Sequence, residues 1–261
     1  MIVFNCPHCR SALYHHDKQL RCAQGHAFDK GRAGDVNLLL PQQKRSKQPG
    51  DSKAMVAARR DFLASGVYQP LAESLAKTVT LLGQGQPKVI ADAGCGEGYY
   101  LRQIQRLCYP HLDYFYQHGG EFIGWDISKY AVQAAAKQAK FKAHWCTVSN
   151  AAIPLPNNAV DLLICAFGFA VAPEFARILC MDNKGRTQTG GQGGYLITLD
   201  SGATHLIELR KIIYEKIKCY QEKNTLPGTL FRLLRQEVIS YQVSLHQKQI
   251  IQLMCMTPHL Y

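Results

Sequence analysis

From residue 89 onward, the sequence alternates between short apolar runs and segments that are long enough to form a helix. The longer segments carry apolar residues at the three- and four-residue spacing of an amphipathic helix. Strands that alternate with helices in this way form a parallel sheet with helices on both faces. The pattern therefore predicts an α/β, mostly parallel, doubly wound sheet, with strands at 89–91, 122–125, 141–148, 160–165 and 195–199 and helices around 131–139, 173–181 and 206–217.

Two further helices are predicted ahead of these strands, and extra strands are predicted after them. The aspartate and serine at 51–52 can cap a helix that extends to Gly66. Apolar residues spaced by four, four and three positions over 71–82 indicate a second helix, which ends at Gly83. Near the end of the chain, the strand-like segment 238–245 is expected to add antiparallel edge strands to the sheet.

The N-terminal segment carries two pairs of metal-ligand residues. Cys6 and Cys9 form a C-x2-C knuckle, and Cys22 and His26 follow as a C-x3-H pair after twelve further residues. Two such pairs on either side of a hairpin-length segment are how small zinc modules are built. Protein ligands then fill all four positions of the metal, so we expect a structural rather than a catalytic Zn²⁺.

The segment between the two pairs is expected to form two short strands around a polar turn. A module of about 30 residues buries too little core to fold alone, so metal would supply the missing stability. His8, His15 and His16 are open as alternative ligands. We prefer His26, because His8 lies inside the knuckle and the other two lie in the turn.

Basic residues outnumber acidic ones by 30 to 19, which gives a formal net charge of +11. Residues 1–62 hold 11 lysines and arginines against 5 aspartates, so a net charge of +6 lies near the N-terminus. An excess of this size favours a polyanionic partner such as RNA. The polar segment 41–50 and the helix after it are either an RNA-contacting element or a solvated linker, and their basic residues are Lys44, Arg45, Lys47, Arg59 and Arg60.

The sequence contains no sign of a membrane or of export. No apolar run approaches the roughly 20 residues that span a bilayer, and the first residues do not resemble a signal peptide. We therefore expect a cytoplasmic protein whose ten cysteines are reduced.

A glycine-rich turn, Asp-Ala-Gly-Cys-Gly-Glu-Gly, follows the strand at 89–91 and opens a helix. Glycines let the backbone turn sharply and approach a ligand closely. The carboxylates of this turn would repel the pyrophosphate of a dinucleotide, but they suit the cationic sulfonium and amino group of S-adenosylmethionine. An aspartate at the end of the next strand can accept hydrogen bonds from both ribose hydroxyls. The predicted cofactor residues are Asp92, Gly94, Gly96, Glu97, Gly98 and Asp126.

The chain combines this turn with the zinc quartet and the basic segment. In this combination it resembles the bacterial 23S rRNA (guanine-N1)-methyltransferases. The resemblance covers most of the chain, and its other stretches are 44–46, 49–52, 58–63, 68–71, 94–100, 126–129, 205–209 and 256–258. It implies a class I (Rossmann-like) methyltransferase fold with a small zinc-ribbon-like module, and cofactor contacts at Tyr68, Gly96, Glu97 and His205. The chain departs from the family pattern at 109–120, 166–170 and 182–194.

The resemblance implies three parts of the chain. We expect a zinc-binding module at 1–36, a basic linker with the start of a helix at 37–60, and an S-adenosylmethionine-dependent methyltransferase domain at 61–261. Besides 23S ribosomal RNA, a homodimer is left open as a partner.

The resemblance also implies a reaction, the transfer of a methyl group to N1 of a guanine in 23S ribosomal RNA. Guanine N1 carries a proton that a base must take, and the sequence indicates no residue for this task. The alternatives are a methyltransferase for another RNA base or a small molecule, and a non-catalytic RNA-binding protein that retains the fold. A covalent role for Cys165, as pyrimidine chemistry would need, is weaker than a core position on its apolar strand.

Overall fold

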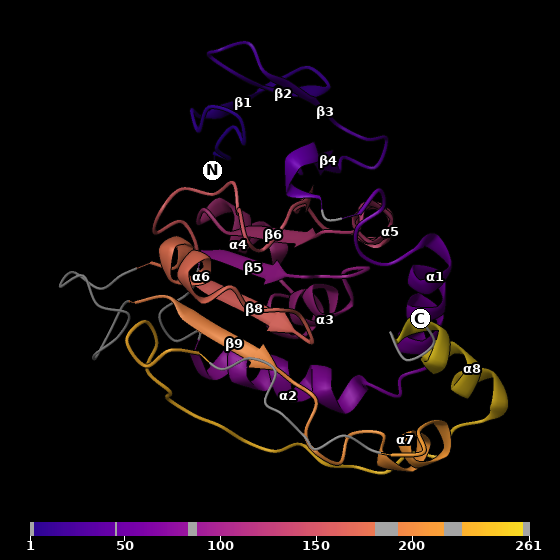
Figure 1. The fold of residues 1–261 in the computed structure, drawn as a ribbon. Coiled ribbons are helices and arrows are strands. Elements are labelled where there is room, and N and C mark those ends of the chain that lie inside the picture. Colours follow the sequence, from indigo (N-terminus) through magenta and orange to yellow (C-terminus); the bar gives the residue numbers. More distant parts are fainter. Residues whose placement is uncertain (1–2, 45, 83–87, 181–192, 217–225, 258–261) are drawn as a thin grey trace.

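The computed structural model describes residues 3–44, 46–82, 88–180, 193–216 and 226–257. Its strands form two sheets. A three-stranded antiparallel sheet from the N-terminal segment lies above one margin of a six-stranded parallel sheet (Figure 1). A loop leads the chain from the small sheet to a short strand at the margin of the large sheet, and the two sheets lie one above the other.

The small sheet consists of β1 (Leu13–His16), β2 (Gln19–Cys22) and β3 (Ala27–Asp29) in that order. The two predicted strands are confirmed as β1 and β2, and Asp17 makes the turn between them with a φ of 52°. β3 was not evident in the sequence, because it is only three residues long and has a single half-buried apolar side chain, Phe28. We call residues 3–36, which contain this sheet, the N-terminal module.

The large sheet has the strand order β4-β7-β6-β5-β8-β9, and every described pairing in it is parallel. The five strands predicted from the sequence are confirmed as β5, β6, β7, β8 and β9. The strands are β4 (Val36–Asn37), β5 (Val89–Ala93), β6 (Glu121–Asp126), β7 (His144–Thr147), β8 (Leu162–Ala166) and β9 (Tyr195–Leu199). β4 is only two residues long, too short for a pattern, yet it ties the end of the N-terminal module to the sheet margin.

Helices connect the strands and cover the sheet. They are α1 (Lys53–Ala64), α2 (Gln69–Leu82), α3 (Tyr99–Cys108), α4 (Leu112–Gln117), α5 (Lys129–Gln138), α6 (Ala172–Ile178), α7 (Ile207–Ile213) and α8 (Gln247–Met256), with a 3-10 turn η1 (Pro41–Gln43). α1 begins as predicted, because the Ser52 hydroxyl accepts a hydrogen bond from the Met55 amide. The departure at 109–120 contains α4, and most of the departure at 182–194 lies outside the described residues. Among the described helices, none has the length and apolar character to cross a membrane.

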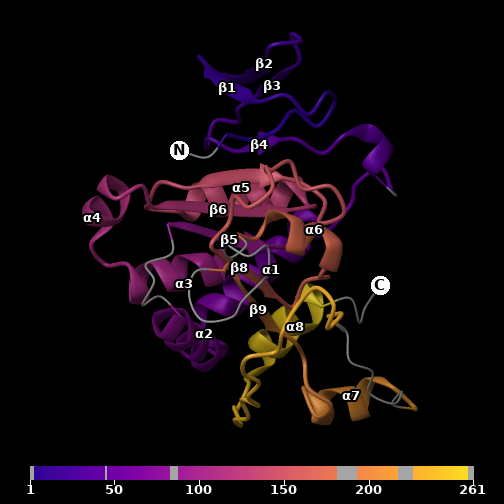
Figure 2. The same cartoon turned by 90° about the vertical axis from the view of Figure 1, so that its left-hand side faces the viewer.

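The side chains of the large sheet fill two apolar cores, one on each face. Ile90 and Ile164 belong to the core that the first three helices and α8 complete, whereas Ala91 and Leu163 belong to the other. This second core is completed by α6 and by the buried residues of the N-terminal module, and Figure 2 shows that module stacked above the large sheet. The doubly wound sheet is thereby confirmed, and the N-terminal module forms part of one of its covering layers.

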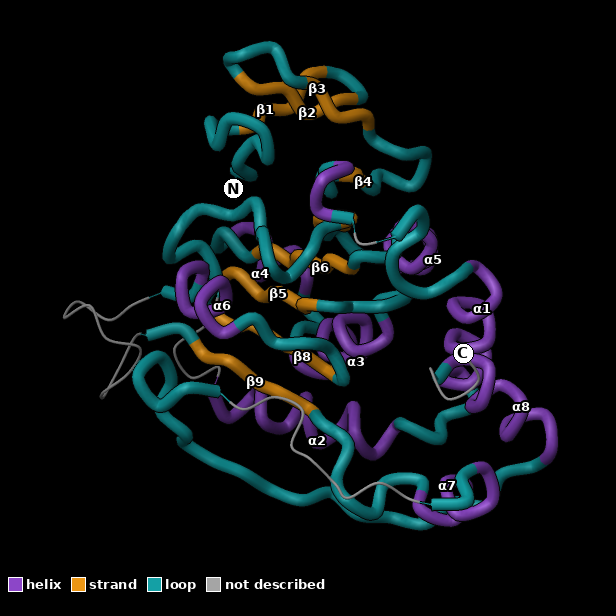
Figure 3. Tube along the Cα trace, in the orientation of Figure 1, coloured by secondary structure: helices purple, strands orange, loops and turns teal. Residues whose placement is uncertain are grey.

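The segment 238–245 is not an edge strand, contrary to its sequence pattern. Figure 3 shows it within a long loop that passes along the underside of the molecule to α8. Ile239, Tyr241 and Leu245 pack against the helical core, and the Tyr241 hydroxyl donates to the carbonyl oxygen of Val67 at 3.0 Å. The segment is therefore anchored by alternate side chains and not by backbone pairing, since the sheet ends at β9.

Candidate functional site

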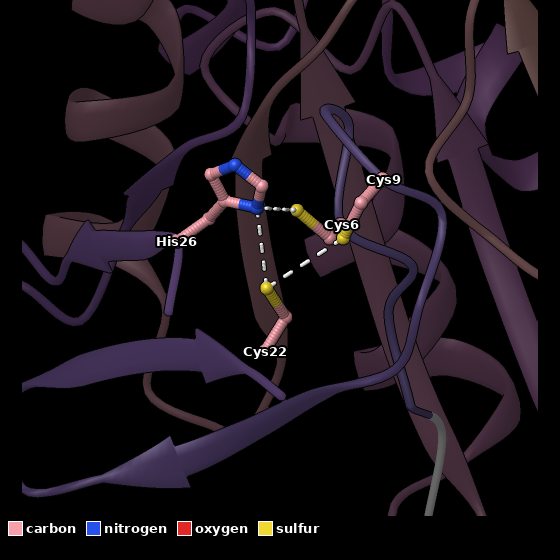
Figure 4. A group of neighbouring side chains, drawn as sticks. All are labelled: Cys6, Cys9, Cys22 and His26. Atoms are coloured by element: carbon pink, nitrogen blue, oxygen red, sulfur yellow. Dashed lines mark hydrogen bonds between the residues drawn. The ribbon is translucent and has the colours of Figure 1, made fainter. Parts of the chain in front are cut away.

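The four predicted metal ligands come together at one end of the N-terminal module (Figure 4). Their ligand atoms all lie within 4.8 Å of one another. The Sγ atoms of Cys9 and Cys22 are 3.6 Å apart, and Nδ1 of His26 lies 3.3 Å from Sγ of Cys22 and 3.6 Å from Sγ of Cys6. Thiolates on a tetrahedral zinc, with Zn–S bonds of about 2.3 Å, are separated by about 3.7 Å, so the quartet fits Zn²⁺ closely.

Backbone turns hold both ligand pairs in place. The Cys6 amide donates to Ser11 and the Arg10 amide donates back to Cys6, each at 2.7 Å, which closes the first knuckle. In the second, Gly25 donates to Cys22 at 3.0 Å with a φ of 84°, a conformation that favours glycine. Local backbone hydrogen bonds thus shape both ligand pairs.

The electrostatics of the quartet also suit a cation. Burial raises the pKa of the Cys22 thiol, but hydrogen bonds from His26, Cys9 and the backbone outweigh burial and lower this pKa to about 6. Hydrogen bonds to Cys9 and Cys22 raise the pKa of His26. Thiolate character at neutral pH is what zinc requires of its cysteine ligands.

The other N-terminal histidines lie outside the quartet. The ring of His8 stacks on His26 with centroids 4.8 Å apart, so it supports a ligand. Nζ of Lys30 lies 2.6 Å from Nδ1 of His15, and His16 lies 3.7 Å from Asp17. The ligand atoms of the three cysteines group with His26 and not with these three residues, so His26 remains the predicted fourth ligand.

The glycine turn joins β5 to α3 at the carboxyl edge of the large sheet. The amides of Gly94 and Cys95 both donate to the Trp125 carbonyl oxygen, at 2.8 and 2.9 Å, which bends the chain back over β6. Gly96 has a φ of 56°, and a side chain built on it would face Arg59 at 3.7 Å. Gly98 is required for another reason, because a Cβ there would meet Ala135 and Trp145 at 3.0 Å.

Asp126 ends β6 and fastens the turn from below. One of its carboxylate oxygens accepts a hydrogen bond from the Gly96 amide at 3.0 Å, and the other accepts from the Ser128 amide at 2.8 Å. Each carboxylate oxygen has two lone pairs, so both oxygens keep acceptor capacity for a ligand. The structure thus places Asp126 directly beside the glycine turn, as the sequence suggested.

Asp92 and Tyr100 are buried beneath the turn with unsatisfied polar atoms. Asp92 is 1% exposed, and neither of its carboxylate oxygens has a hydrogen-bond partner among the described residues. Burial, with a contribution from the charge of Asp126, raises the pKa of Asp92 to about 7. The Tyr100 hydroxyl is also buried without a described partner. Unsatisfied buried groups in a native fold call for a specific explanation, and a ligand supplies one.

The raised pKa of Asp92 lowers the stability of the folded protein at neutral pH relative to acidic pH. A carboxyl in an unfolded chain ionises near its ordinary value of 3.8, whereas the folded state holds the proton up to about pH 7. The folded state binds more protons in this interval, so Asp92 makes the free energy of unfolding fall as the pH rises from about 4 to about 7.

Glu97 is engaged within the protein. Its carboxylate is 1% exposed, and it accepts hydrogen bonds from Arg102 at 2.8 and 3.1 Å and from the Gln138 amide at 2.6 Å. These contacts neutralise its charge and tie the start of α3 to α5. Glu97 therefore fixes the position of the turn, and its carboxylate charge is already compensated before any ligand binds.

A cluster of three rings, those of Tyr68, Phe167 and His205, lies near the turn on the side of the helical core. Oη of Tyr68 lies 3.4 Å from Nε2 of His205, and the Phe167 ring lies 6.0 Å from the Tyr68 ring and 6.1 Å from the imidazole. Burial raises the pKa of Tyr68 to about 12, so this hydroxyl stays protonated. The structure thus brings together Tyr68 and His205, which are 137 positions apart. Phe167 was seen in the sequence only as part of a departure.

Cys165 does not face this site as a nucleophile. It lies in the middle of the apolar core on the N-terminal-module side of the sheet and is fully buried. The core position expected for a cysteine on an apolar strand is the observed one.

The predicted basic cluster divides into two groups. Arg59 and Arg60 are paired with Asp51 and Asp61, at 2.6 and 2.8 Å. Lys44 and Lys47 are exposed instead, and together with Lys129 they line a pocket of about 100 Å³ between the linker and the start of α5. Arg45 lies outside the described residues. The exposed lysines therefore sit near the carboxyl ends of β6 and β7, the same sheet edge as the glycine turn.

Two family models match the chain. The model described as RlmA, N-terminal, a zinc-ribbon family, matches residues 4–47. The model described as Methyltransferase domain matches residues 90–181. The first match contains the metal quartet and the lysines of the linker, and the second contains the glycine turn and Asp126.

Two curated relatives are similar over most of the chain. A 23S rRNA (guanine(748)-N(1))-methyltransferase from Streptomyces fradiae is 35% identical over 210 residues, 78% of this chain and 65% of the relative. A relative from Micromonospora griseorubida, provisionally named a 23S rRNA (guanine-N(1)-)-methyltransferase, is 31% identical over 221 residues, 78% of this chain and 67% of the relative. This chain thus spans about two thirds of the length of these relatives.

Two solved structures that match part of the chain are methyltransferases. The plantazolicin methyltransferase BpumL in complex with SAH has a TM-score of 0.43 and 15% identity, and the match covers 63% of each chain. A SAM dependent methyltransferase from Aquifex aeolicus has a TM-score of 0.38 and 19% identity, over 50% of this chain and 70% of that one.

We predict that the purified protein carries one zinc per chain and that Cys22→Ala releases it. Three ligands hold the metal much more weakly than four, and the module depends on it for stability. Zinc is measured by inductively coupled plasma mass spectrometry, and amide hydrogen exchange reports unfolding, which we expect mainly within residues 1–36. Cys108→Ala, which removes a thiol outside the quartet, should keep its zinc. Full occupancy in Cys22→Ala would show that the ligand set is wrong.

Proposed function

Because this chain belongs to the family of 23S rRNA (guanine-N1)-methyltransferases, we propose that it transfers a methyl group from S-adenosylmethionine to N1 of a guanine in 23S ribosomal RNA. The observation that carries the proposal is the union, in one chain, of the matched N-terminal zinc ribbon with a methyltransferase domain whose ligand edge is intact. A small-molecule methyltransferase would have no evident use for the first part. A cytoplasmic location agrees with a ribosomal substrate.

The residues around the glycine turn fit S-adenosylmethionine. Asp126 keeps a free lone pair on each oxygen, and a carboxylate with this geometry can accept both ribose hydroxyls. Gly94 and Gly96 carry no side chains and therefore let a ligand approach the backbone of the turn, and Gly98 packs α3 tightly beneath it. Tyr68 and His205 border the same space from the helical side. We assign all six residues to the cofactor site, with Glu97 supporting the turn.

Asp92 gives the site its charge preference. A buried carboxylate without a described partner is costly unless a cation or a hydrogen-bond donor reaches it. The cofactor carries a positive sulfonium and an ammonium group, whereas a dinucleotide would bring phosphates to the same place. The unsatisfied oxygens of Asp92 therefore favour S-adenosylmethionine over a nicotinamide cofactor.

When bound, S-adenosylmethionine supplies an electrophilic methyl group. The chain supplies position, because in-line displacement depends on holding the acceptor atom at the correct distance and angle. Phe167 and His205 offer partly exposed rings at the carboxyl end of the sheet on which an unpaired or flipped guanine can stack, and the buried Tyr68 supports both rings. Their place at the edge of the turn brings a stacked base next to the reacting group.

The three parts of the chain divide the work. We propose that 1–36 is a structural zinc module, that 37–60 is a basic linker leading into α1, and that 61–261 is the methyltransferase domain. A closed ligand set of three cysteines and one histidine leaves no open position on the metal, so zinc stabilises the module and takes no part in the reaction. The exposed lysines of the linker would meet RNA phosphates as the target base enters the site.

The proposed activity is tested by incubating the zinc-loaded protein with labelled S-adenosylmethionine and unmodified 23S ribosomal RNA, and by mapping the modified nucleotide. We expect one methylated guanine whose N1 methyl group blocks Watson–Crick pairing and stops reverse transcriptase. Methylation at another base would support the first alternative. Tight cofactor binding without transfer to ribosomal RNA would support a non-catalytic RNA-binding protein.

Asp126→Ala is predicted to weaken S-adenosylmethionine binding by about 1.5–3 kcal/mol, because it removes two charge-assisted hydrogen bonds to the ribose. Isothermal titration calorimetry measures the loss. Asp113→Ala is the matched control, since Asp113 is exposed on α4 and should leave the affinity unchanged. Equal affinities for the Asp126 variant and the parent would move the ribose to another part of the protein.

Replacement of Lys44, Lys47 and Lys129 together by alanine is predicted to weaken RNA binding and to flatten its salt dependence. Each lost phosphate contact lowers the slope of log K against log salt by about 0.7–0.9. Binding of a 23S rRNA fragment is measured at several salt concentrations, and cofactor affinity should stay the same. Alanine at Lys77, Arg106 and Lys211, which removes the same charge elsewhere, is the control. An unchanged slope would mean that the linker is only a tether.

A further inference from the structure

Arg59 lies against the glycine turn with one donor unused. Its Nη2 atom contacts the Asp51 carboxylate at 2.6 Å and donates to the Met256 carbonyl oxygen at 2.9 Å. Its Nε atom is buried and has no hydrogen-bond partner among the described residues. The guanidinium is therefore fixed by two anchors, one from the segment before α1 and one from α8, while the Nε–H donor has no acceptor in the part of the chain that the structure describes.

The position of Arg59 places this donor inside the candidate cofactor site. A side chain built on Gly96 would meet Cδ of Arg59 at 3.7 Å, so the arginine stem covers the open face of the turn. Its positive charge acts to lower the pKa of Asp126 and of Tyr68, although burial raises both. Arg59 is thus close to the two residues that border the site on opposite sides.

The unsatisfied groups around the turn form a complementary pair. The buried side-chain atoms that lack a partner in the described structure belong to Arg59, Asp92 and Tyr100. One of these residues is a cation that needs an acceptor, and another is a carboxylate that needs a donor. An α-amino acid in its zwitterionic form offers one carboxylate and one ammonium group, so it would satisfy both.

We propose that Arg59 binds the α-carboxylate of the amino-acid end of S-adenosylmethionine through its Nε–H group, opposite Asp92. This inference rests on the proposed cofactor and adds the subsite that orients its amino-acid end. Arginine suits the task because its guanidinium remains charged at all working pH values, so the Nε–H donor makes a charge-assisted hydrogen bond. The contacts to Asp51 and Met256 hold the guanidinium in place, so the ligand does not have to order it.

The experiment compares two nucleosides that differ in the amino-acid end. S-adenosylhomocysteine has the α-carboxylate and the α-amino group, whereas 5′-methylthioadenosine lacks both and keeps the adenosine. Binding of each to the full-length, zinc-loaded protein is measured by isothermal titration calorimetry. For Arg59→Gln we expect S-adenosylhomocysteine to bind roughly 10–100-fold more weakly, the usual loss for one charge-assisted hydrogen bond, while 5′-methylthioadenosine binds as it does to the parent.

Two further variants keep the result interpretable. Arg59→Lys retains the charge and can still pair with Asp51, so this variant should fold even if Arg59→Gln does not. It should lose part of the affinity for S-adenosylhomocysteine and none for 5′-methylthioadenosine. Arg106→Gln removes an exposed arginine of α3 whose hydrogen bonds, among the described residues, go to Gln103, and it should change neither affinity. Circular dichroism melting of each variant without ligand checks that the fold is retained.

The outcomes separate the inference from the proposed function. If both nucleosides weaken equally in both Arg59 variants, Arg59 supports the pocket as a whole and the carboxylate assignment is wrong. An unchanged affinity for S-adenosylhomocysteine also overturns it. If the parent protein binds neither nucleoside, the cofactor assignment itself fails, and this inference fails with it.

Discussion

The carboxylate of Asp92 is buried at the end of the central strand β5 without a partner among the described residues, and the surrounding structure is organised around that constraint. A group of this kind destabilises the fold unless something else satisfies it. The neighbouring groups fix the turn above it: Asp126 accepts a hydrogen bond from the Gly96 amide, Glu97 is paired with Arg102, and glycines let the backbone bend tightly. The protein therefore maintains a fixed, charged cradle, which is the arrangement expected of a pre-formed ligand site.

Trp125 connects this cradle to the metal centre. Its carbonyl oxygen accepts the two amides that bend the glycine turn, and its indole belongs to the same buried cluster as Cys6 and Cys22. The indole nitrogen also donates to Asn150 at 2.7 Å. The N-terminal module is therefore part of the packing that holds β6 in position and not a separate appendage. Loss of zinc should be felt at the cofactor edge through this shared core, in addition to any effect on RNA.

Local patterns in the sequence were enough to predict the sites whose residues are neighbours in the chain. The metal quartet follows from two short spacings, and the turn with Asp126 follows from a strand, glycines and a second strand. Residues that depend on distant packing were missed or misread. Arg59 looked like part of a basic surface until Met256 and Asp51 fixed it over Gly96. The segment 238–245 was predicted as a strand because alternation reports which side chains are buried and not whether the backbone is paired.

The most direct test of this account is the free energy of unfolding of Asp92→Asn, measured in urea at pH 8 with and without saturating S-adenosylhomocysteine. At this pH the parent carries the full cost of the buried charge. The variant should be more stable than the parent without ligand, by about 1–3 kcal/mol. A ligand at 100 times its Kd should stabilise the parent by about 2.7 kcal/mol and the variant far less. A variant that is less stable without ligand, yet gains as much from it as the parent does, would contradict the account.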